Sequence, residues 1–272
     1  MPGYGSWTAP FVDGLAGIFT LSKFHTATLP PAARPKAYET PNGIDPSFLV
    51  DGDNAATVFA YGSAPNRGLY EVLKGWPAVR GRVPNATLVV YYGFSPAFVT
   101  WGARHIPAFD AWRAEIERLL GQPGVDYRGM VGHDELARGY ARAGFVLYPT
   151  TYPETGCVSV MKAMALGAIP VTSRFAGSVV PELTVHFDLG PATPRRADAE
   201  ASILLDDLKP AVDAADVAWQ ADFAAAAADA AERAARGELD GHRAAMKRYA
   251  RDRFLWKHVA EKWEAHFLGR AT

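Results

Sequence analysis

The chain has 272 residues, 49% of them hydrophobic, and this length allows one large or two modest domains around a sizeable core. Its formal net charge of −1 gives no electrostatic reason to expect nucleic acid or an anionic membrane as a partner. A single cysteine excludes an internal disulfide and a cysteine-based zinc site. The sequence has no signal-peptide pattern and no apolar run of membrane-spanning length, so we expect a cytoplasmic protein without a transmembrane segment.

The two ends of the chain differ from its middle. Residues 1–46 are rich in proline and glycine and contain one apolar run, GIFTLS at 17–22, before a helix-like stretch. Beyond Glu182 the chain is rich in alanine, and 206–237 is expected to form one or two helices with a weak apolar face. The last segment predicts a helical tail, because one stripe carries Trp256, Val259, Ala260, Trp263 and Phe267. These aromatic rings need a covering surface, either in this domain or in a separate one.

The middle of the chain alternates strand-like segments with helix-like ones. The strand-like segments are 57–62, 87–92, 125–129, 145–149 and 169–172, and the helix-like segments between them are 68–82, 108–121, 133–142 and 158–166. Short, fully apolar strands that alternate with helices indicate a parallel sheet covered on both faces. The sequence therefore predicts a Rossmann-like α/β domain followed by a helical carboxyl-terminal tail.

The stretch from Tyr148 to Thr172 carries the strongest functional signal. It predicts a strand end, a loop that contains Glu154, a short helix, a stop at Gly167 and a second strand. The loop and the helix start place a carboxylate, small residues and free backbone N–H groups at the carboxyl end of a buried strand. Open α/β sheets bind ligands at that edge, and helix N-termini bind phosphates. The stretch therefore predicts an anion-binding site.

Five segments, by their order and spacing, resemble a known family. They are PNGID at 41–45, RGL at 67–69, YRGMVGHDEL at 127–136, YPTTYPETGCVSVMKAMALGAIPVT at 148–172 and the closing aromatic helix. Over about residues 17–190 and 250–268 the chain resembles the carboxyl-terminal half of a retaining GT-B fold glycosyltransferase of the glycosyl transferases group 1 type. In that family this half binds a nucleotide-sugar, and an amino-terminal domain of similar size binds the acceptor.

The resemblance implies a division of the chain into three parts. Residues 1–46 would be a remnant of the acceptor domain with the linker, 47–240 the nucleotide-sugar-binding Rossmann-like domain, and 241–272 a terminal crossover helix. Asn42 and Gly43 fall in the linker motif and are expected to be structural. A complete enzyme would need roughly a hundred or more further residues. An acceptor-binding domain or subunit supplied separately is therefore the expected partner, besides the nucleotide-sugar itself.

The resemblance assigns roles to the loop after the predicted fourth strand. Glu154 corresponds to the first acid of the family's Glu-x7-Glu motif, which implies a contact with hydroxyls of the donated sugar. A carboxylate beside a phosphate-binding helix start would also stabilise positive charge developing at an anomeric carbon. The plainer interpretation is a surface acid favoured by the helix dipole. Gly156, Cys157 and Val158 would offer backbone N–H groups to the diphosphate, and the Cys157 thiol is expected to be a packing group.

Arg67 occupies the position of the family's basic residue before glycine, which implies that it neutralises the diphosphate. The planar fork of an arginine suits phosphate oxygens, whereas the plainer interpretation is a solvated arginine at a helix start. The family often carries a second arginine five residues earlier, where this chain has Gly62. Ser63 is expected to offer a neutral hydrogen bond there instead.

Lys162 is the main departure from the family pattern. The residue eight positions after Glu154 is normally an acid that accepts hydrogen bonds from the ribose, and a lysine has no acceptor. Three hypotheses follow. The lysine is solvated in a weakened site, or it reaches the diphosphate and compensates for Gly62, or the protein no longer uses a sugar donor.

The leading hypothesis is the nucleotide-sugar-binding half of a retaining hexosyltransferase that needs neither a metal nor a cofactor, present as a fragment or as one part of a split enzyme. The alternative is a catalytically inactive module of the same fold that binds a nucleotide-sugar or a partner. A nucleotide-sugar epimerase of this fold lacks a credible acid/base pair in the sequence. A dinucleotide oxidoreductase is disfavoured because no GxGxxG follows the first strand.

Overall fold

The computed structural model describes residues 7–106, 108–195 and 214–269. Its centre is a five-stranded sheet with the order β5-β4-β3-β6-β7, in which every pair of neighbours is parallel. The strands are β3 (Ala55–Ser63), β4 (Thr87–Tyr92), β5 (Val125–Gly129), β6 (Ala143–Tyr148) and β7 (Ile169–Thr172). All five predicted strands are present: β4, β5 and β7 have the predicted bounds, and the ends of β3 and β6 lie within two residues of the predicted ones. The predicted parallel α/β fold is confirmed.

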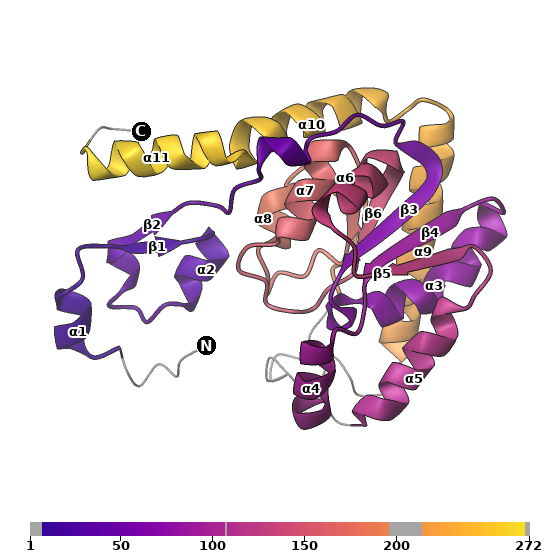
Figure 1. Ribbon diagram of the computed structural model, residues 1–272, viewed down its shortest axis with the longest axis horizontal. Coiled ribbons are helices and arrows are strands. Elements are labelled where there is room, and N and C mark those ends of the chain that lie inside the picture. The colour runs from indigo at the N-terminus through magenta and orange to yellow at the C-terminus, as the bar shows by residue number, and fades with distance from the viewer. Residues whose placement is uncertain (1–6, 107, 196–213, 270–272) are drawn as a thin grey trace.

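Helices cover both faces of this sheet (Figure 1). One layer contains α3 (Leu69–Arg82), α5 (Phe109–Leu120) and α9 (Ala214–Ala235), with α9 packed on α3 and β3. The other contains α6 (His133–Arg142), α7 (Val158–Leu166), the short α8 (Val180–Thr184) and α10 (Asp240–Phe254). Every residue of β6 and β7 is buried, because helices lie on both sides of them. The sequence analysis missed α4 (Pro96–His105), and 206–213 of its Ala-rich helical segment lies outside the described residues.

The order of the strands creates a switch point between β3 and β6. From β3 the chain proceeds outward through β4 to β5, and it then crosses back to β6 and proceeds outward in the other direction to β7. The connections after β3 and β6 therefore diverge at the carboxyl end of the sheet. In open α/β sheets this divergence leaves the crevice in which ligands bind.

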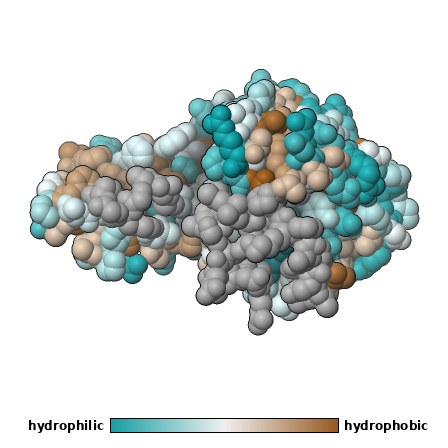
Figure 2. Space-filling model, turned by 90° about the horizontal axis from the view of Figure 1, so that it is seen from below, coloured by the Kyte–Doolittle hydropathy of each residue, from teal (hydrophilic) through white to brown (hydrophobic). Residues whose placement is uncertain are grey.

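The first part of the chain forms a small lobe beside the main domain. It contains α1 (Ala9–Asp13), β1 (Ile18–Thr20), α2 (Lys23–Thr28), the 3-10 helix η2 (Arg34–Lys36) and β2 (Ala37–Glu39). β1 and β2 form a separate parallel pair, and Val12, Leu29 and Ala33 form a small core of their own. The lobe projects from one end of the molecule, and apolar residues gather on the face of it that Figure 2 shows. Two further 3-10 helices, η3 (Pro46–Phe48) and η4 (Pro65–Arg67), flank β3.

The end of the chain crosses from the main domain to the lobe. The predicted single terminal helix is in fact two helices, α10 and α11 (Trp256–Phe267), separated by the extended residue Leu255. The break has a backbone cause, because Ile44 donates its N–H to the Phe254 carbonyl at 2.6 Å and accepts from Trp256 N–H at 3.1 Å. No helix in the described ranges is both long and apolar enough to cross a bilayer.

The predicted apolar stripe of the tail faces the lobe. Val259 is fully buried, and the Phe19 ring lies 5.8 Å from Trp263 and 5.6 Å from Phe267 between centroids. The Trp263 indole donates a hydrogen bond to Thr40 Oγ1 at 2.9 Å. The lobe covers the stripe only in part, because Trp256, Trp263 and Phe267 remain 43%, 38% and 71% exposed. The division of the chain at residues 46 and 240 stays a prediction.

Candidate functional site

The candidate site is centred on an ion pair between two predicted site residues. Arg67 ends η4 after β3, and Glu154 lies in the loop after β6, so the pair spans the switch point of the sheet. Arg67 Nε donates to Glu154 Oε1 at 2.7 Å, and both side chains are 17% exposed. The sequence analysis assigned these residues to different ligand groups. The structure brings them into direct contact.

Arg67 keeps an unused hydrogen-bonding group. Its guanidinium stacks on the Tyr152 ring, with the central carbon 3.1 Å from the ring centroid. Its Nη1 is buried and has no hydrogen-bond partner in the described part of the chain, and the same holds for Oδ1 of the preceding Asn66. A buried donor of a charged group that lacks a partner costs free energy, so these atoms indicate a place where a ligand would add hydrogen bonds.

A glycine allows η4 to lie this close to β6. Gly68 has φ of +99° and forms the N-cap of α3. A Cβ at this position would lie 2.8 Å from the Pro149 backbone, just beyond the end of β6. The RGL segment therefore needs its glycine both for the left-handed conformation and for the close approach. This approach brings Arg67 within reach of Glu154.

Tyr148 joins Glu154 to Ser63. Its hydroxyl donates to Glu154 Oε1 at 2.9 Å and lies 3.4 Å from Ser63 Oγ at the end of β3. Burial is the main cause that raises the pKa of Tyr148 well above its ordinary value, so the phenol remains a hydrogen-bond donor at neutral pH. The sequence analysis placed Ser63 in the site and missed Tyr148, which it treated only as part of a strand.

Gly62 lies where the resemblance would place a second basic residue, and its surroundings leave no room for a side chain. Both the Ser159 hydroxyl and the Tyr140 hydroxyl donate to the Gly62 carbonyl, at 2.8 and 3.3 Å. A Cβ at Gly62 would overlap the Tyr140 hydroxyl. The contact between β3, α6 and α7 therefore leaves no room for a side chain, and an arginine at this position would require a different packing.

The loop from Gly156 to Val158 leads into α7 beside the ion pair. Cys157 is the N-cap of α7, and its side chain makes no capping hydrogen bond to the helix. The amides of the first helical turn therefore have no partner from within the helix. The Cys157 thiol is buried, and burial, followed by the charge of Glu154, raises its pKa to about 12. The thiol is protonated at neutral pH and acts as a packing group.

Lys162 does not join the cluster. It lies one turn into α7, with Nζ 4.3 Å from the centroid of the Phe48 ring in η3. Partial burial lowers its pKa, and no acidic side chain in the described ranges forms an ion pair with it. The lysine is therefore a partly buried cation against an aromatic ring, neither freely solvated nor in contact with Arg67 or Glu154.

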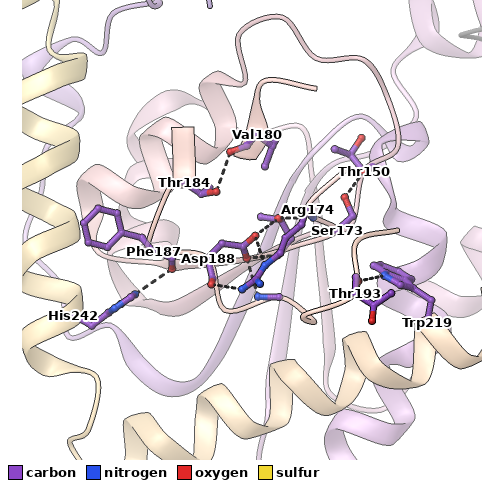
Figure 3. Close-up of polar contacts among 12 residues, drawn as sticks. Thr150, Ser173, Arg174, Val180, Thr184, Phe187, Asp188, Thr193, Trp219 and His242 are labelled. Atoms are coloured by element: carbon purple, nitrogen blue, oxygen red, sulfur yellow. Dashed lines mark hydrogen bonds and ion pairs between the residues drawn. The ribbon is translucent and has the colours of Figure 1, made fainter. Parts of the chain in front are cut away.

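A second polar cluster fixes the neighbouring edge of the sheet (Figure 3). The buried Asp188 accepts hydrogen bonds from Thr172 N–H at 2.9 Å and from Gly190 N–H at 2.8 Å. Arg174 Nε lies 3.4 Å from the Asp188 carboxylate, and Ser173 donates to the Thr150 carbonyl. These contacts satisfy Asp188 and tie the loop after β7 to the loop after β6. No motif or periodic pattern in the sequence predicts this cluster, which we interpret as structural.

Comparisons with known proteins find a likeness in fold. No family model matches the chain, and no curated protein matches it in sequence. Among solved structures, Anabaena HepE in complex with UDP and glucose is 13% identical, with a TM-score of 0.67 over 93% of this chain and 63% of that one. The pneumococcal O-GlcNAc transferase GtfA in complex with UDP and GlcNAc is 15% identical, with a TM-score of 0.59 over 95% of this chain and 46% of that one.

A third structure extends the same likeness. Sucrose-phosphate synthase from Thermosynechococcus elongatus is 17% identical, with a TM-score of 0.56 over 96% of this chain and 59% of that one. The chain has the fold of the GT-B glycosyltransferases. It spans about half to two thirds of the length of the three GT-B proteins named here. In the described residues, no group of three His, Cys, Asp or Glu side chains is arranged to hold a metal ion.

Proposed function

We propose that the chain binds a nucleotide-diphosphate sugar at the carboxyl ends of β3 and β6, as the sugar-donor half of a glycosyltransferase. The observation that carries this proposal is the buried Nη1 of Arg67, which has no hydrogen-bond partner among the described residues, on an arginine whose charge acts on Cys157 at the N-cap of α7. An arginine fork and a helix N-terminus together favour a multiply charged phosphate group. The position at the switch point of the sheet agrees with this role.

Different groups of the site would bind the diphosphate and the sugar. Arg67 Nη1 and the backbone amides of Gly156, Cys157 and Val158 would stabilise negative charge on the departing diphosphate. Ser63 would add a neutral hydrogen bond. Both protein contacts to the Glu154 carboxylate in the described chain go to Oε1, so Oε2 would accept hydrogen bonds from the sugar.

The Arg67–Glu154 ion pair would also stabilise the site before a ligand binds. Without a ligand, Glu154 balances the charge of a mostly buried guanidinium, which limits the cost of desolvating it. A diphosphate would then compete with Glu154 for Arg67 and free the carboxylate for the sugar. This exchange needs no metal, because the positive charge is supplied by Arg67 and the helix amides. Transfer to an acceptor hydroxyl with retention, and an acceptor site supplied by a separate domain or subunit, complete the proposal.

Nucleotide binding tests the proposal directly. We expect saturable binding of at least one of UDP, GDP, ADP or their glucose or GlcNAc conjugates by isothermal titration calorimetry, with Arg67→Ala weakening it by roughly tenfold or more. Arg236→Ala, which removes an exposed arginine paired with Glu238 in the turn after α9, should bind like the unchanged protein. No saturable binding, or an Arg67→Ala variant that binds normally, would refute the site.

A binding module without turnover is the second candidate. The observation that favours it is Lys162. Where the resembled family has an acid that accepts hydrogen bonds from the ribose, this chain has a cation that lies against Phe48. The enzyme and the binding module are distinguished by measuring the release of UDP from a UDP-sugar in the presence of acceptor alcohols. Sustained release that Glu154→Gln abolishes supports an enzyme, whereas tight binding without release supports the module.

A further inference from the structure

The amino-terminal lobe contacts the loop that carries Glu154 through that loop's backbone. Ser22 Oγ donates to the Thr155 carbonyl at 2.9 Å, and Asn42 Nδ2 donates to the Gly156 carbonyl at 3.2 Å. A Cβ at Gly156 would lie 2.6 Å from Asn42 Nδ2 and 2.8 Å from the Leu21 side chain. The lobe therefore packs directly on the two residues that follow Glu154.

Glu182 makes a second connection between the same two parts. Its carboxylate accepts hydrogen bonds from the backbone N–H groups of Lys23 at 3.1 Å and Phe24 at 2.6 Å, one on each oxygen. These are the first two amides of α2, so the main domain supplies a carboxylate where the helix of the lobe has unpaired donors. The partners are 158 and 159 residues apart in the chain.

The segment 179–182, which ends at Glu182, also contacts the backbone of Glu154. Val179, three residues before Glu182, donates its N–H to the Glu154 carbonyl at 2.8 Å, and the Glu182 N–H in turn bonds to the Val179 carbonyl at 2.9 Å. One short segment thus contacts the lobe at one end and the backbone of Glu154 at the other. A shift of the lobe would be transmitted to Glu154 by two routes, through Thr155 and Gly156 and through Glu182 and Val179.

We propose that Glu182 is a positioning residue that couples docking of the lobe to the conformation of the Glu154 loop. This inference rests on the proposed sugar-donor site, since it is that site's carboxylate which Glu182 would hold in place. It gives the lobe a role in ligand binding, because the lobe then sets where Glu154 presents Oε2. Glu182 would act through the backbone and would not itself touch the ligand.

Two variants remove the contact from opposite sides. Glu182→Ala deletes the acceptor. Lys23→Pro deletes one N–H at the first position of α2, where proline is tolerated, and the preceding Ser22 is extended, as a residue before proline prefers to be. Lys23→Ala keeps that N–H and controls for the side chain. Glu264→Ala removes an exposed glutamate of α11 and controls for loss of an acid.

Hydrogen–deuterium exchange without ligand is the first measurement. We expect the amides of 154–157 and Val179 to exchange roughly tenfold faster in Glu182→Ala and less so in Lys23→Pro, with both controls unchanged. A merely local cap would speed exchange at Lys23 and Phe24 alone in Glu182→Ala, and near Phe24 alone in Lys23→Pro, which has no amide hydrogen at residue 23. Those two results together would overturn the proposal.

The second measurement compares the affinities for UDP-sugar and for UDP. We expect Glu182→Ala to weaken UDP-sugar binding by roughly three- to tenfold, and UDP itself by less, since the loss falls on the sugar contact. An unchanged UDP-sugar affinity in a protein whose Arg67→Ala variant has lost it would overturn the proposal. If no nucleotide binds at all, the proposed function fails, and the exchange measurement still decides whether the lobe and the loop are coupled.

Discussion

At the scale of single residues, the site combines groups that the sequence could name with contacts that it could not. Arg67 and Glu154 were identified from their motifs, but they are 87 residues apart, and only the switch point of the sheet brings them together. Tyr148 was missed because an aromatic residue at a strand end is usually a core residue. Its hydroxyl joins the candidate site only through its hydrogen bond to Glu154.

Lys162 gives a prediction at this scale. We expect Lys162→Glu to tighten binding of UDP by roughly three- to tenfold, because a carboxylate in that position would accept hydrogen bonds from a ribose. Pyrophosphate, which has no ribose, should bind with unchanged affinity. Lys162→Gln is the size-matched control without a charge. Weaker binding of both ligands in Lys162→Glu would instead show that the lysine reaches the diphosphate.

Cys157 gives a second prediction. With a pKa of about 12, roughly one thiol in ten thousand is ionised at pH 8, and the side chain is buried as well. We therefore expect negligible labelling by iodoacetamide in an hour under native conditions and complete labelling in concentrated urea. Reactivity should rise with pH toward 12, since a raised pKa moves the thiolate to higher pH. Rapid native labelling at pH 7 would contradict the buried position.

At the scale of elements, β3, β4, β6 and β7 were predictable because each is a short, largely apolar run. The exception is β5, which carries Asp126 and Arg128 and has no fully buried residue. The helix α4 was missed, although Ser95 caps it and Pro96 occupies its first turn. That capping signal was present in the sequence, and Phe98 and Trp101 follow it at helical spacing, so α4 was predictable. The break at Leu255 was not predictable, because it depends on hydrogen bonds to Ile44, more than 200 residues earlier.

The contact of β3 with α6 and α7 gives a prediction for Gly62. A methyl group there would overlap the Tyr140 hydroxyl, so Gly62→Ala should lower the free energy of unfolding by about 1–3 kcal/mol. The added change Tyr140→Phe removes the overlapping oxygen and should recover part of that loss. Gly81→Ala, in α3 with open space around it, should instead stabilise by about 0.5–1 kcal/mol. Urea denaturation measures the free energy of unfolding of all three variants. An unchanged value for Gly62→Ala would contradict this packing.

At the scale of the whole molecule, the lobe is held to the main domain from two sides. The Glu182 and Ser22 contacts lie on one side, and the aromatic contacts of α11 lie on the other. The core of the lobe itself is small, and β1 and β2 form only a two-stranded sheet. Such a sheet is marginal alone, so its order depends on packing against these neighbours.

The tail helix therefore gives the last prediction, on how the lobe is held. Trp263 packs on Phe19 and donates to Thr40, whereas Phe267, on the same stripe, is 71% exposed. We expect Trp263→Ala to weaken docking of the lobe by about 2–3 kcal/mol, seen as faster proteolysis within 29–36 and faster exchange of β1 and β2. Phe267→Ala should have less than half of that effect, because it removes less buried area. Equal effects of the two variants would mean that the Trp263 contacts contribute no more to docking than the exposed Phe267 does. No effect of either variant would mean that the contacts of Ser22 and Glu182 hold the lobe and that α11 does not.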